Sequence, residues 1–265
     1  MSKVDMSNFI RYNLYEDDVT IVKQYGDYIL KVCNMSQVRI SGLEKQSKDS
    51  ELFVESKYSK KNSVNAEKLS NNISRAKSKV LELALCNDWD YFVTFTIDKE
   101  KYNRYDLKTY RKDFSEFLHN FNRRRSKEDK VSYILIPELH EDGAWHMHGL
   151  IHGLQPTDLF INQNGYPSWK SYNDKFGFME IDKVKSKERV SSYITKYITK
   201  EVDKSVKELG GHLYYSSNGL KTAEQLYRGK AKLLCDWDYE HPDGYCRIKT
   251  FDIRKDNYTD YLVLE

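Results

Sequence analysis

The sequence predicts an α+β fold, with helices packed on one face of an antiparallel β-sheet. First, segments rich in β-branched and aromatic residues alternate with amphipathic segments in the order β-α-β-β-β-α from Trp89 onward. Second, a tight "EDGA" turn joins two of the expected strands into a hairpin. Third, 39% hydrophobic and 31% charged residues are typical of a folded domain.

Three regions are expected along the 265 residues. Residues 1–62 form a β-rich extension and a basic linker, in which "VTIVKQYGDYILKVC" predicts a hairpin around a turn. Residues 63–205 form the core. Residues 206–265 form a C-terminal extension packed on that core, with a short helix at "AEQLYRGKAKLL" and a strand at "YCRIKTFDI".

The core elements follow from hydrophobic spacing. A helix is predicted from about 64 to 85, a strand at 89–98, and a second helix in "YDLKTYRKDFSEFLHNFNRRR", with Asp106 or Asn103 as its cap. Residues 131–138 and 145–152 form the hairpin, and 155–177 are expected to be loops. The strand "FMEIDKVKS" then precedes a helix in "KERVSSYITKYITKEVDKSVKE".

Composition restricts the setting more than the chemistry. A net charge of +3 does not by itself indicate nucleic acid, and the basic clusters near Lys77 and Arg124 are commonly solvated helix faces. The 4 scattered cysteines are interpreted as reduced thiols. With no signal peptide, transmembrane run or P-loop, we expect a cytoplasmic protein that carries no NTP motor and contacts no membrane.

Four of the 7 histidines lie in "PELHEDGAWHMHGLIHG". On a strand, His146 and His148 point to the same side, so two imidazoles are spaced to share one metal ion. Glu138 or His140 on the neighbouring strand is expected to supply a third ligand. Such a set suits Mn²⁺ or Mg²⁺, although Zn²⁺ or Fe²⁺ fits the same donors. His140 and His152 are expected to be bystanders or to support the ligands.

A tyrosine pair recurs in "SSYITKYITKE". On a helix, Val190, Ile194 and Ile198 form an apolar stripe, and Tyr193 and Tyr197 lie beside it, one turn apart. A phenol, with a pKa of about 10, is a poor nucleophile unless a metal or a lysine stabilises the phenolate. Tyrosine pairs at this spacing also commonly serve only in packing.

These motifs together resemble the HUH endonucleases, in particular the rolling-circle replication initiators of phages and plasmids. "FVTFTID" resembles their first motif, "HMHG" with the upstream Glu138 resembles the second, and "YITKYITKE" resembles the Tyr-x-x-Lys motif. The likeness spans about Trp89 to Glu201, and it implies an RRM- or ferredoxin-like nuclease core.

The resemblance implies a reaction. Glu138, His146 and His148 would hold Mg²⁺ or Mn²⁺, and a tyrosine would attack the scissile phosphate to form a 5′-phosphotyrosine and a free 3′-OH. Tyr197 is favoured over Tyr193, and both are candidate nucleophiles. The flanking Lys196 and Lys200 would orient the phosphate or stabilise the phenolate.

The same resemblance implies origin DNA, single-stranded or in a hairpin, as substrate, and a host helicase, polymerase and single-strand-binding protein as partners in a bacterial cell. The candidate DNA contacts are Lys77, Lys79, Arg123, Arg124 and Arg125. Three alternatives stay open: a transposase or relaxase with the same strand cleavage, a non-catalytic DNA-binding protein, and a metal-dependent hydrolase in which water attacks.

Overall fold

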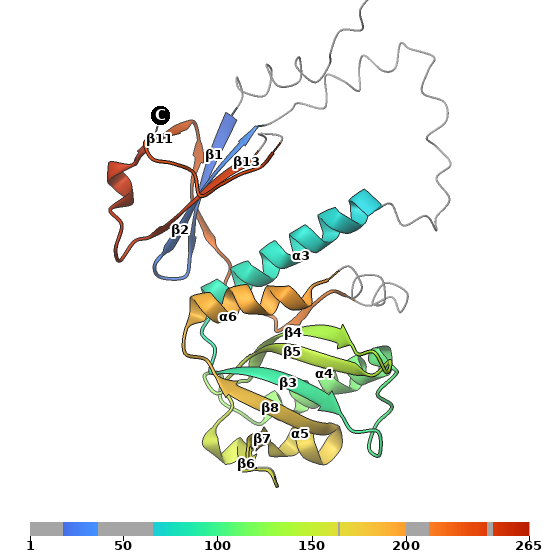
Figure 1. The fold of residues 1–265 in the computed structure, drawn as a ribbon. Helices are drawn as coiled ribbons and strands as arrows, with labels where there is room; N and C mark the ends of the chain where they lie inside the picture. The colour runs from blue at the N-terminus through green and yellow to red at the C-terminus, as the bar shows by residue number, and fades with distance from the viewer. Residues whose placement is uncertain (1–17, 37–65, 164, 200–211, 243–245, 265) are drawn as a thin grey trace, which may run out of the picture. The chain divides into compact units, whose positions relative to one another are not determined.

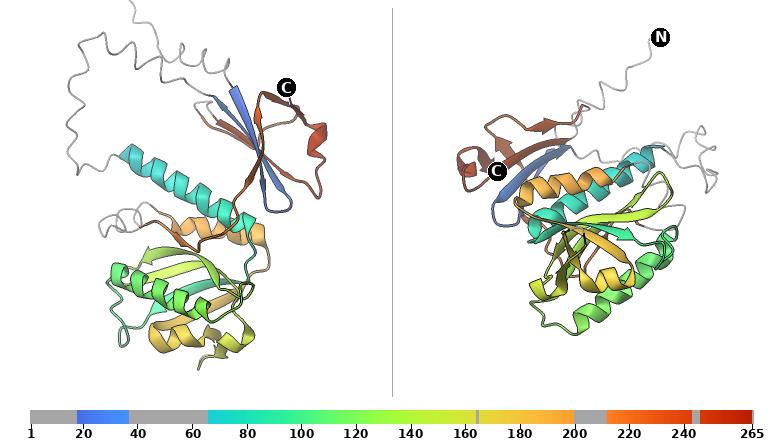
Figure 2. Two further views of the ribbon diagram at one scale, coloured as in Figure 1. Left: turned by 180° about the vertical axis from the view of Figure 1, so that it is seen from behind. Right: turned by 60° about the horizontal axis from the view of Figure 1, so that its bottom comes forward.

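The computed structural model describes residues 18–36, 66–163, 165–199, 212–242 and 246–264. The chain divides into two compact units, each treated separately below. One unit is the continuous stretch Val64–Thr222, and the other combines Met1–Ser63 with Ala223–Glu265. Figures 1 and 2 show the ribbon from three directions.

The continuous unit is built on a five-stranded antiparallel sheet with the strand order β8-β3-β5-β4-β9. Both predicted strands of the central hairpin are confirmed, and they pair in register from Ser132 with His152 to Leu139 with Trp145. The sheet's strands are β3 (Tyr91–Ile97), β4 (Ser132–Leu139), β5 (Trp145–His152), β8 (Gly177–Lys183) and β9 (Tyr215–Ser216). The predicted α+β class with an antiparallel sheet is confirmed.

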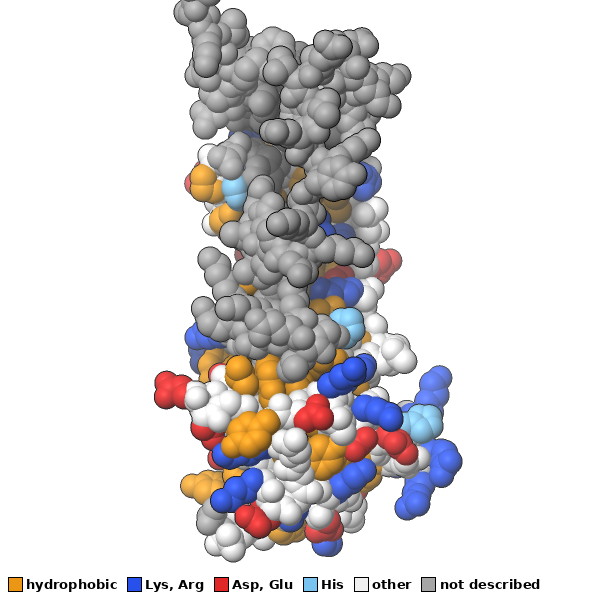
Figure 3. Space-filling model, turned by 90° about the vertical axis from the view of Figure 1, so that its right-hand side faces the viewer, with side chains coloured by type: hydrophobic (Ala, Val, Ile, Leu, Met, Phe, Trp, Pro, Cys, Tyr) orange, Lys and Arg blue, Asp and Glu red, His pale blue; other side chains and the backbone are white. Residues whose placement is uncertain are grey.

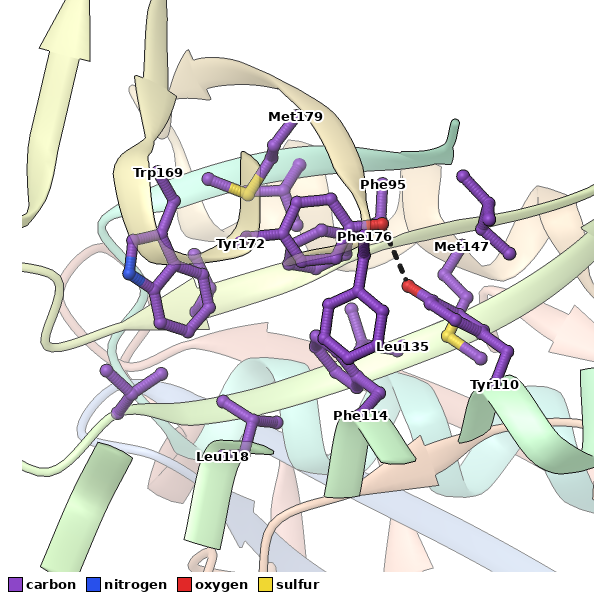
Figure 4. Close-up of a cluster of buried hydrophobic side chains, with 14 of the residues drawn as sticks. Phe95, Tyr110, Phe114, Leu118, Leu135, Met147, Trp169, Tyr172, Phe176 and Met179 are labelled. Carbon is purple, nitrogen blue, oxygen red and sulfur yellow. Dashed lines mark hydrogen bonds between the residues drawn. The ribbon is translucent and has the colours of Figure 1, made fainter. Parts of the chain in front are cut away.

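An aromatic core covers one face of this sheet (Figure 4). Helix α4 (Leu107–Arg123) contributes Tyr110 and Phe114, and α5 (Lys170–Lys175) contributes Tyr172, whose hydroxyl lies 3.0 Å from that of Tyr110. The side chain of Asp106 accepts a hydrogen bond from Thr109 N at 3.0 Å and caps α4, as predicted. Large aromatic side chains buried on this face fix the position of the sheet.

The stretch expected to be loops holds regular structure. A 3-10 turn (Pro156–Asp158), a short hairpin of β6 (Leu159–Ile161) and β7 (Pro167–Trp169), and α5 replace it. The prediction for 155–177 was therefore wrong. Trp169 and Tyr172, both fully buried, anchor the stretch to the core, and such tertiary burial has no local sequence signature.

Two further helices lie on the opposite face, so the sheet is covered on both sides and not on one (Figure 1). They are α3 (Ala66–Cys86) and α6 (Lys187–Ile194), and they pack over Ile134, Ile136 and Leu150. The apolar stripe predicted for the last helix is confirmed, because Ile194 and Ile198 are fully buried. Within the described ranges, no helix is both long and apolar enough to span a bilayer.

Helix α6 ends earlier than predicted. It stops at Ile194, and a 3-10 turn (Thr195–Tyr197) follows. The Thr195 hydroxyl donates to the carbonyl of Ser192 at 2.7 Å, a local side-chain bond that competes with helix continuation. The remainder of the predicted helix, from residue 200, lies outside the described residues.

The second unit pairs strands from both ends of the chain. The predicted N-terminal hairpin is confirmed, and its second strand also pairs with the predicted strand at 246–252. The sheet order is β10-β1-β2-β13-β12, with β1 (Asp18–Tyr25), β2 (Ile29–Ser36), β10 (Glu224–Gly229), β12 (Tyr239–Glu240) and β13 (Cys246–Asp252). A separate pair joins β11 (Ala231–Leu233) to β14 (Leu262–Leu264), which follows a 3-10 turn (Tyr258–Asp260).

The short helix predicted within 223–234 was wrong, because this stretch forms β10 and β11. Pairing of β10 with β1, from Thr20 opposite Gly229, supplies backbone partners that a local pattern does not reveal. The sequence assigned all of 206–265 to one extension of the core. The structure divides it, leaving residues to Thr222 with the core and placing Ala223 onward with the N-terminal strands.

Candidate active site

The face of the sheet under α3 and α6 carries polar side chains in register across four strands. Residues opposite one another in antiparallel strands point to the same side. Glu138 pairs with His146, His146 with Thr96, and Thr96 with Phe178. The next row consists of Ile136, His148, Thr94 and Glu180. Trp145 and Met147 alternate to the opposite face and are buried there, as the sequence predicted.

Short contacts join the two histidines to their neighbours. The Nε2 atom of His148 lies 2.5 Å from Glu138 Oε2, and its Nδ1 atom lies 3.1 Å from the Thr94 hydroxyl. His146 Nδ1 lies 3.5 Å from the Thr96 hydroxyl. Each threonine therefore faces the Nδ1 side of one ring. An Nδ1–H donating to the threonine oxygen leaves Nε2 with the free lone pair that a metal ligand needs.

His140 lies against the same group. Its ring stacks on that of His146 with centroids 3.7 Å apart and an interplanar angle of 13°. Its Nε2 atom lies 3.5 Å from Glu138 Oε2. His152, by contrast, lies two rows from His148 and contacts Asp90, with Nδ1 3.0 Å from Oδ2. The structure thus separates the two histidines that the sequence treated alike.

The imidazoles are held in the neutral form. Burial, reinforced by His140 and His148, lowers the pKa of His146 to about 4. Burial also lowers the pKa of His148, although the hydrogen bond to Glu138 opposes this shift. Neutral imidazole is the form that coordinates metal ions.

The donor types fit a divalent metal, and the spacing is that of a closed hydrogen-bonded set. Two imidazoles and one carboxylate are ligands that Mn²⁺, Zn²⁺ and Fe²⁺ accept. In the part of the chain that the structure describes, no three His, Cys, Asp or Glu side chains stand in a ligand arrangement. Glu138 bonds His148 directly, so a bound ion would replace that hydrogen bond.

Both tyrosines of the predicted pair reach this group. The Tyr197 ring stacks on His148 with centroids 4.0 Å apart and an interplanar angle of 14°. The Tyr193 and Tyr197 hydroxyls are 3.1 Å apart. Phe92 of β3 supports both rings, at centroid distances of 5.4 Å and 6.1 Å. A phenol on a distant segment is therefore in direct contact with one candidate metal ligand.

The two phenols differ in environment. Burial raises the pKa of Tyr197 well above its ordinary value, with a further contribution from the Tyr193 hydroxyl. Tyr193 is 44% exposed. The Lys196 ammonium lies 5.2 Å from the centre of the Tyr193 ring. Lys200 lies outside the described residues.

The candidate DNA-contact residues lie in different places. Arg123 and Arg124 are exposed at the end of α4, on the face of the sheet away from the histidines. Arg125 holds loops together, bonding Asp158 at 2.7 Å and the carbonyl of Gly153 at 3.0 Å. On α3, Lys77 is exposed and Lys79 pairs with Glu82 at 2.8 Å; both share the histidine face of the sheet. Figure 3 shows basic, acidic and hydrophobic side chains intermixed on one side of the molecule.

Sequence reasoning missed Thr94, Thr96 and Phe92 as parts of this site. All three lie in "FVTFTID", which the sequence indicated only as a core strand. Their signal is the alternation Phe-x-Thr-x-Thr, which places a hydroxyl opposite each histidine once β3 pairs with β5.

Comparisons with known proteins agree with this arrangement. Residues 90–202 match the model of a family of replication-associated proteins, described by its member ORF2. That segment contains β3, the histidine hairpin and the tyrosine pair, and its likeness to the family is consistent with a replication initiator. No curated protein and no solved structure matches the chain.

Proposed function

We propose that this protein is a metal-dependent HUH-type nickase that cuts and rejoins single-stranded origin DNA, and thereby initiates and terminates rolling-circle replication of a phage or plasmid. The observation that carries the proposal is the stacking of Tyr197 on His148, at 4.0 Å between ring centres. It unites the histidine strand with the tyrosine segment. The match to a replication-associated family supports the biological role.

Glu138, His146 and His148 would hold Mg²⁺ or Mn²⁺. When bound, the ion supplies a positive charge that polarises the scissile phosphate. Thr94 and Thr96 orient the two imidazoles through their Nδ1 atoms. The covered, aromatic side of the site, with Phe92 under both phenols, holds the tyrosines in place.

Tyr197 is the proposed nucleophile. Its phenolic oxygen forms a bond to phosphorus as the P–O3′ bond breaks. The DNA 5′-phosphate then remains on the tyrosine, and the departing 3′-oxygen takes up a proton. Because the Tyr197 pKa is raised, the phenol stays protonated until substrate binds. Tyr193, whose hydroxyl lies 3.1 Å away, is placed to accept that proton or to act in a second cleavage.

The free 3′-OH would prime synthesis by a host polymerase, with a host helicase and single-strand-binding protein acting on the duplex. The reverse attack of a 3′-OH on the phosphotyrosine restores the phosphodiester and closes the strand. The bond energy is conserved in the tyrosine ester, so rejoining requires no nucleotide cofactor. Lys196, beside Tyr193, is placed to contact the phosphate.

A denaturing gel tests the tyrosine mechanism. Protein with Mn²⁺ is incubated with a random-sequence pool of single-stranded oligonucleotides labelled at the 3′ end, and the expected result is label that migrates with the protein. Tyr197→Phe should abolish most of the adduct, and Tyr193→Phe with Tyr197→Phe all of it. The matched control Tyr166→Phe changes a tyrosine that is 64% exposed in the β6–β7 hairpin and should leave the adduct unchanged.

The alternatives give different gels. Cleavage without protein-bound label, retained in the double tyrosine variant, indicates a hydrolase in which water attacks and overturns the proposal. DNA binding without any cleavage indicates a non-catalytic protein and also overturns it. An adduct formed only at a transfer origin or a transposon end keeps the chemistry but replaces the replication role with that of a relaxase or transposase.

A further inference from the structure

The row of residues that contains Glu138 and His146 continues beyond the candidate metal ligands. Thr96 follows on β3, and Phe178 on the edge strand β8 ends the row. Because neighbouring strands are about 4.8 Å apart, Phe178 stands about 10 Å from His146 across the sheet, on the same face. It is therefore within the reach of a nucleotide whose phosphate lies at the histidines.

Phe178 breaks the pattern of its own strand. In β8 the inward residues Gly177 and Met179 are buried, and the outward residues Glu180 and Asp182 are exposed and charged. Phe178 occupies an outward position and is 46% exposed. An aromatic ring in the solvent-facing register of an edge strand has no packing role that explains it.

The chemistry around Phe178 favours a base over a phosphate. Glu180 lies in the next row on the same face, and its carboxylate repels a phosphate backbone passing along β8. A nucleobase carries no charge and can stack on the ring. On the other side of the candidate site, Tyr193 is 44% exposed, so an extended strand would cross between two aromatic rings.

We propose that Phe178 is a stacking platform for a nucleobase of the single strand bound at the histidine–tyrosine site. The proposal deepens the proposed function, because it assigns the strand's path across the open part of the sheet, from the histidines toward β8. Phe178 is a positioning residue: it would hold a base so that a neighbouring phosphate lies at His146 and His148.

The test measures binding without cleavage. Fluorescence anisotropy in EDTA compares an oligothymidylate with an abasic strand of equal length. Phe178→Ala should weaken oligothymidylate binding about 5- to 150-fold, the range for loss of one stacked base. It should leave the abasic strand unaffected. Phe178→Trp should retain affinity, and Tyr166→Ala, which removes an exposed aromatic ring elsewhere, should change neither strand.

Salt separates stacking from charge. The ratio of the two affinities should stay constant between about 50 and 200 mM salt, whereas a phosphate contact would shrink as salt rises. Equal weakening of both strands by Phe178→Ala, or no weakening, overturns the proposal. So does a homodimer that Phe178→Ala dissociates with DNA affinity unchanged, because a second copy then covers the ring. None of these readouts depends on a covalent adduct, so failure of the nickase mechanism is recognised separately.

Discussion

Replacing the Thr94 hydroxyl by a methyl group, in Thr94→Val, removes the partner of His148 Nδ1 at nearly constant shape. The bond measures 3.1 Å, a normal hydrogen-bond length, and Thr94 is half-buried. Its loss releases the ring orientation and the tautomer that keeps Nε2 free for a metal. Supporting partners of this kind typically contribute 10- to 100-fold to metal affinity, so we expect a loss of about that size for Mn²⁺.

Thr96→Val provides the matched comparison. The corresponding distance to His146 Nδ1 is 3.5 Å, at the limit of a hydrogen bond, so the loss should be smaller, about 3-fold. His152→Ala removes an imidazole of the same strand that contacts Asp90 and should not alter Mn²⁺ affinity.

Isothermal titration calorimetry of the metal-free variants with Mn²⁺ at neutral pH measures these differences without DNA. The ordering Thr94→Val, Thr96→Val, His152→Ala, from largest loss to none, is expected. Equal losses for both threonine variants, or wild-type affinity for Thr94→Val, would refute the assignment of the threonines as the groups that orient the imidazoles.

Two further predictions concern the scaffold. Gly149→Ala should destabilise the core by about 1–3 kcal/mol or more, because the added Cβ would stand 2.2 Å from the Ile134 carbonyl oxygen; thermal unfolding measures this, and an unchanged midpoint would contradict it. Asp106→Ala should cost about 0.5–2 kcal/mol at neutral pH, by loss of the α4 cap. The hydrogen bond from Thr109 N lowers the pKa of Asp106, so the folded state stabilises the charged form. This contribution is present above the unfolded pKa of about 3.9 and is lost as pH falls through the folded pKa. Urea unfolding should show the two proteins converging in acid, and Asp106→Asn, an equally good cap, should match wild type at neutral pH.

The histidine hairpin was predictable from the sequence because its determinants are local. Strict alternation fixes which side chains share a face, and the short turn with Gly143 at φ +80° fixes the register that sets Glu138 opposite His146. The stripes of α4 and α6 follow in the same way from their helical spacing, so the elements that carry the site were largely visible in the sequence.

The contacts that complete the site were not visible. Stacking of Tyr197 on His148 joins segments about fifty residues apart and depends on how α6 docks on the sheet. The threonines acquire their role only when β3 pairs with β5. Pairing of N-terminal and C-terminal strands in the second unit likewise joins distant segments, which local propensity does not encode.

A crystal grown with Mn²⁺ tests the central claim most directly, through the position of the anomalous scattering peak. The account predicts one peak bounded by Glu138 and the Nε2 atoms of His146 and His148, with the Tyr197 hydroxyl facing the same space. A peak at other residues, or no peak while Glu138 stays bonded to His148 Nε2, would contradict it.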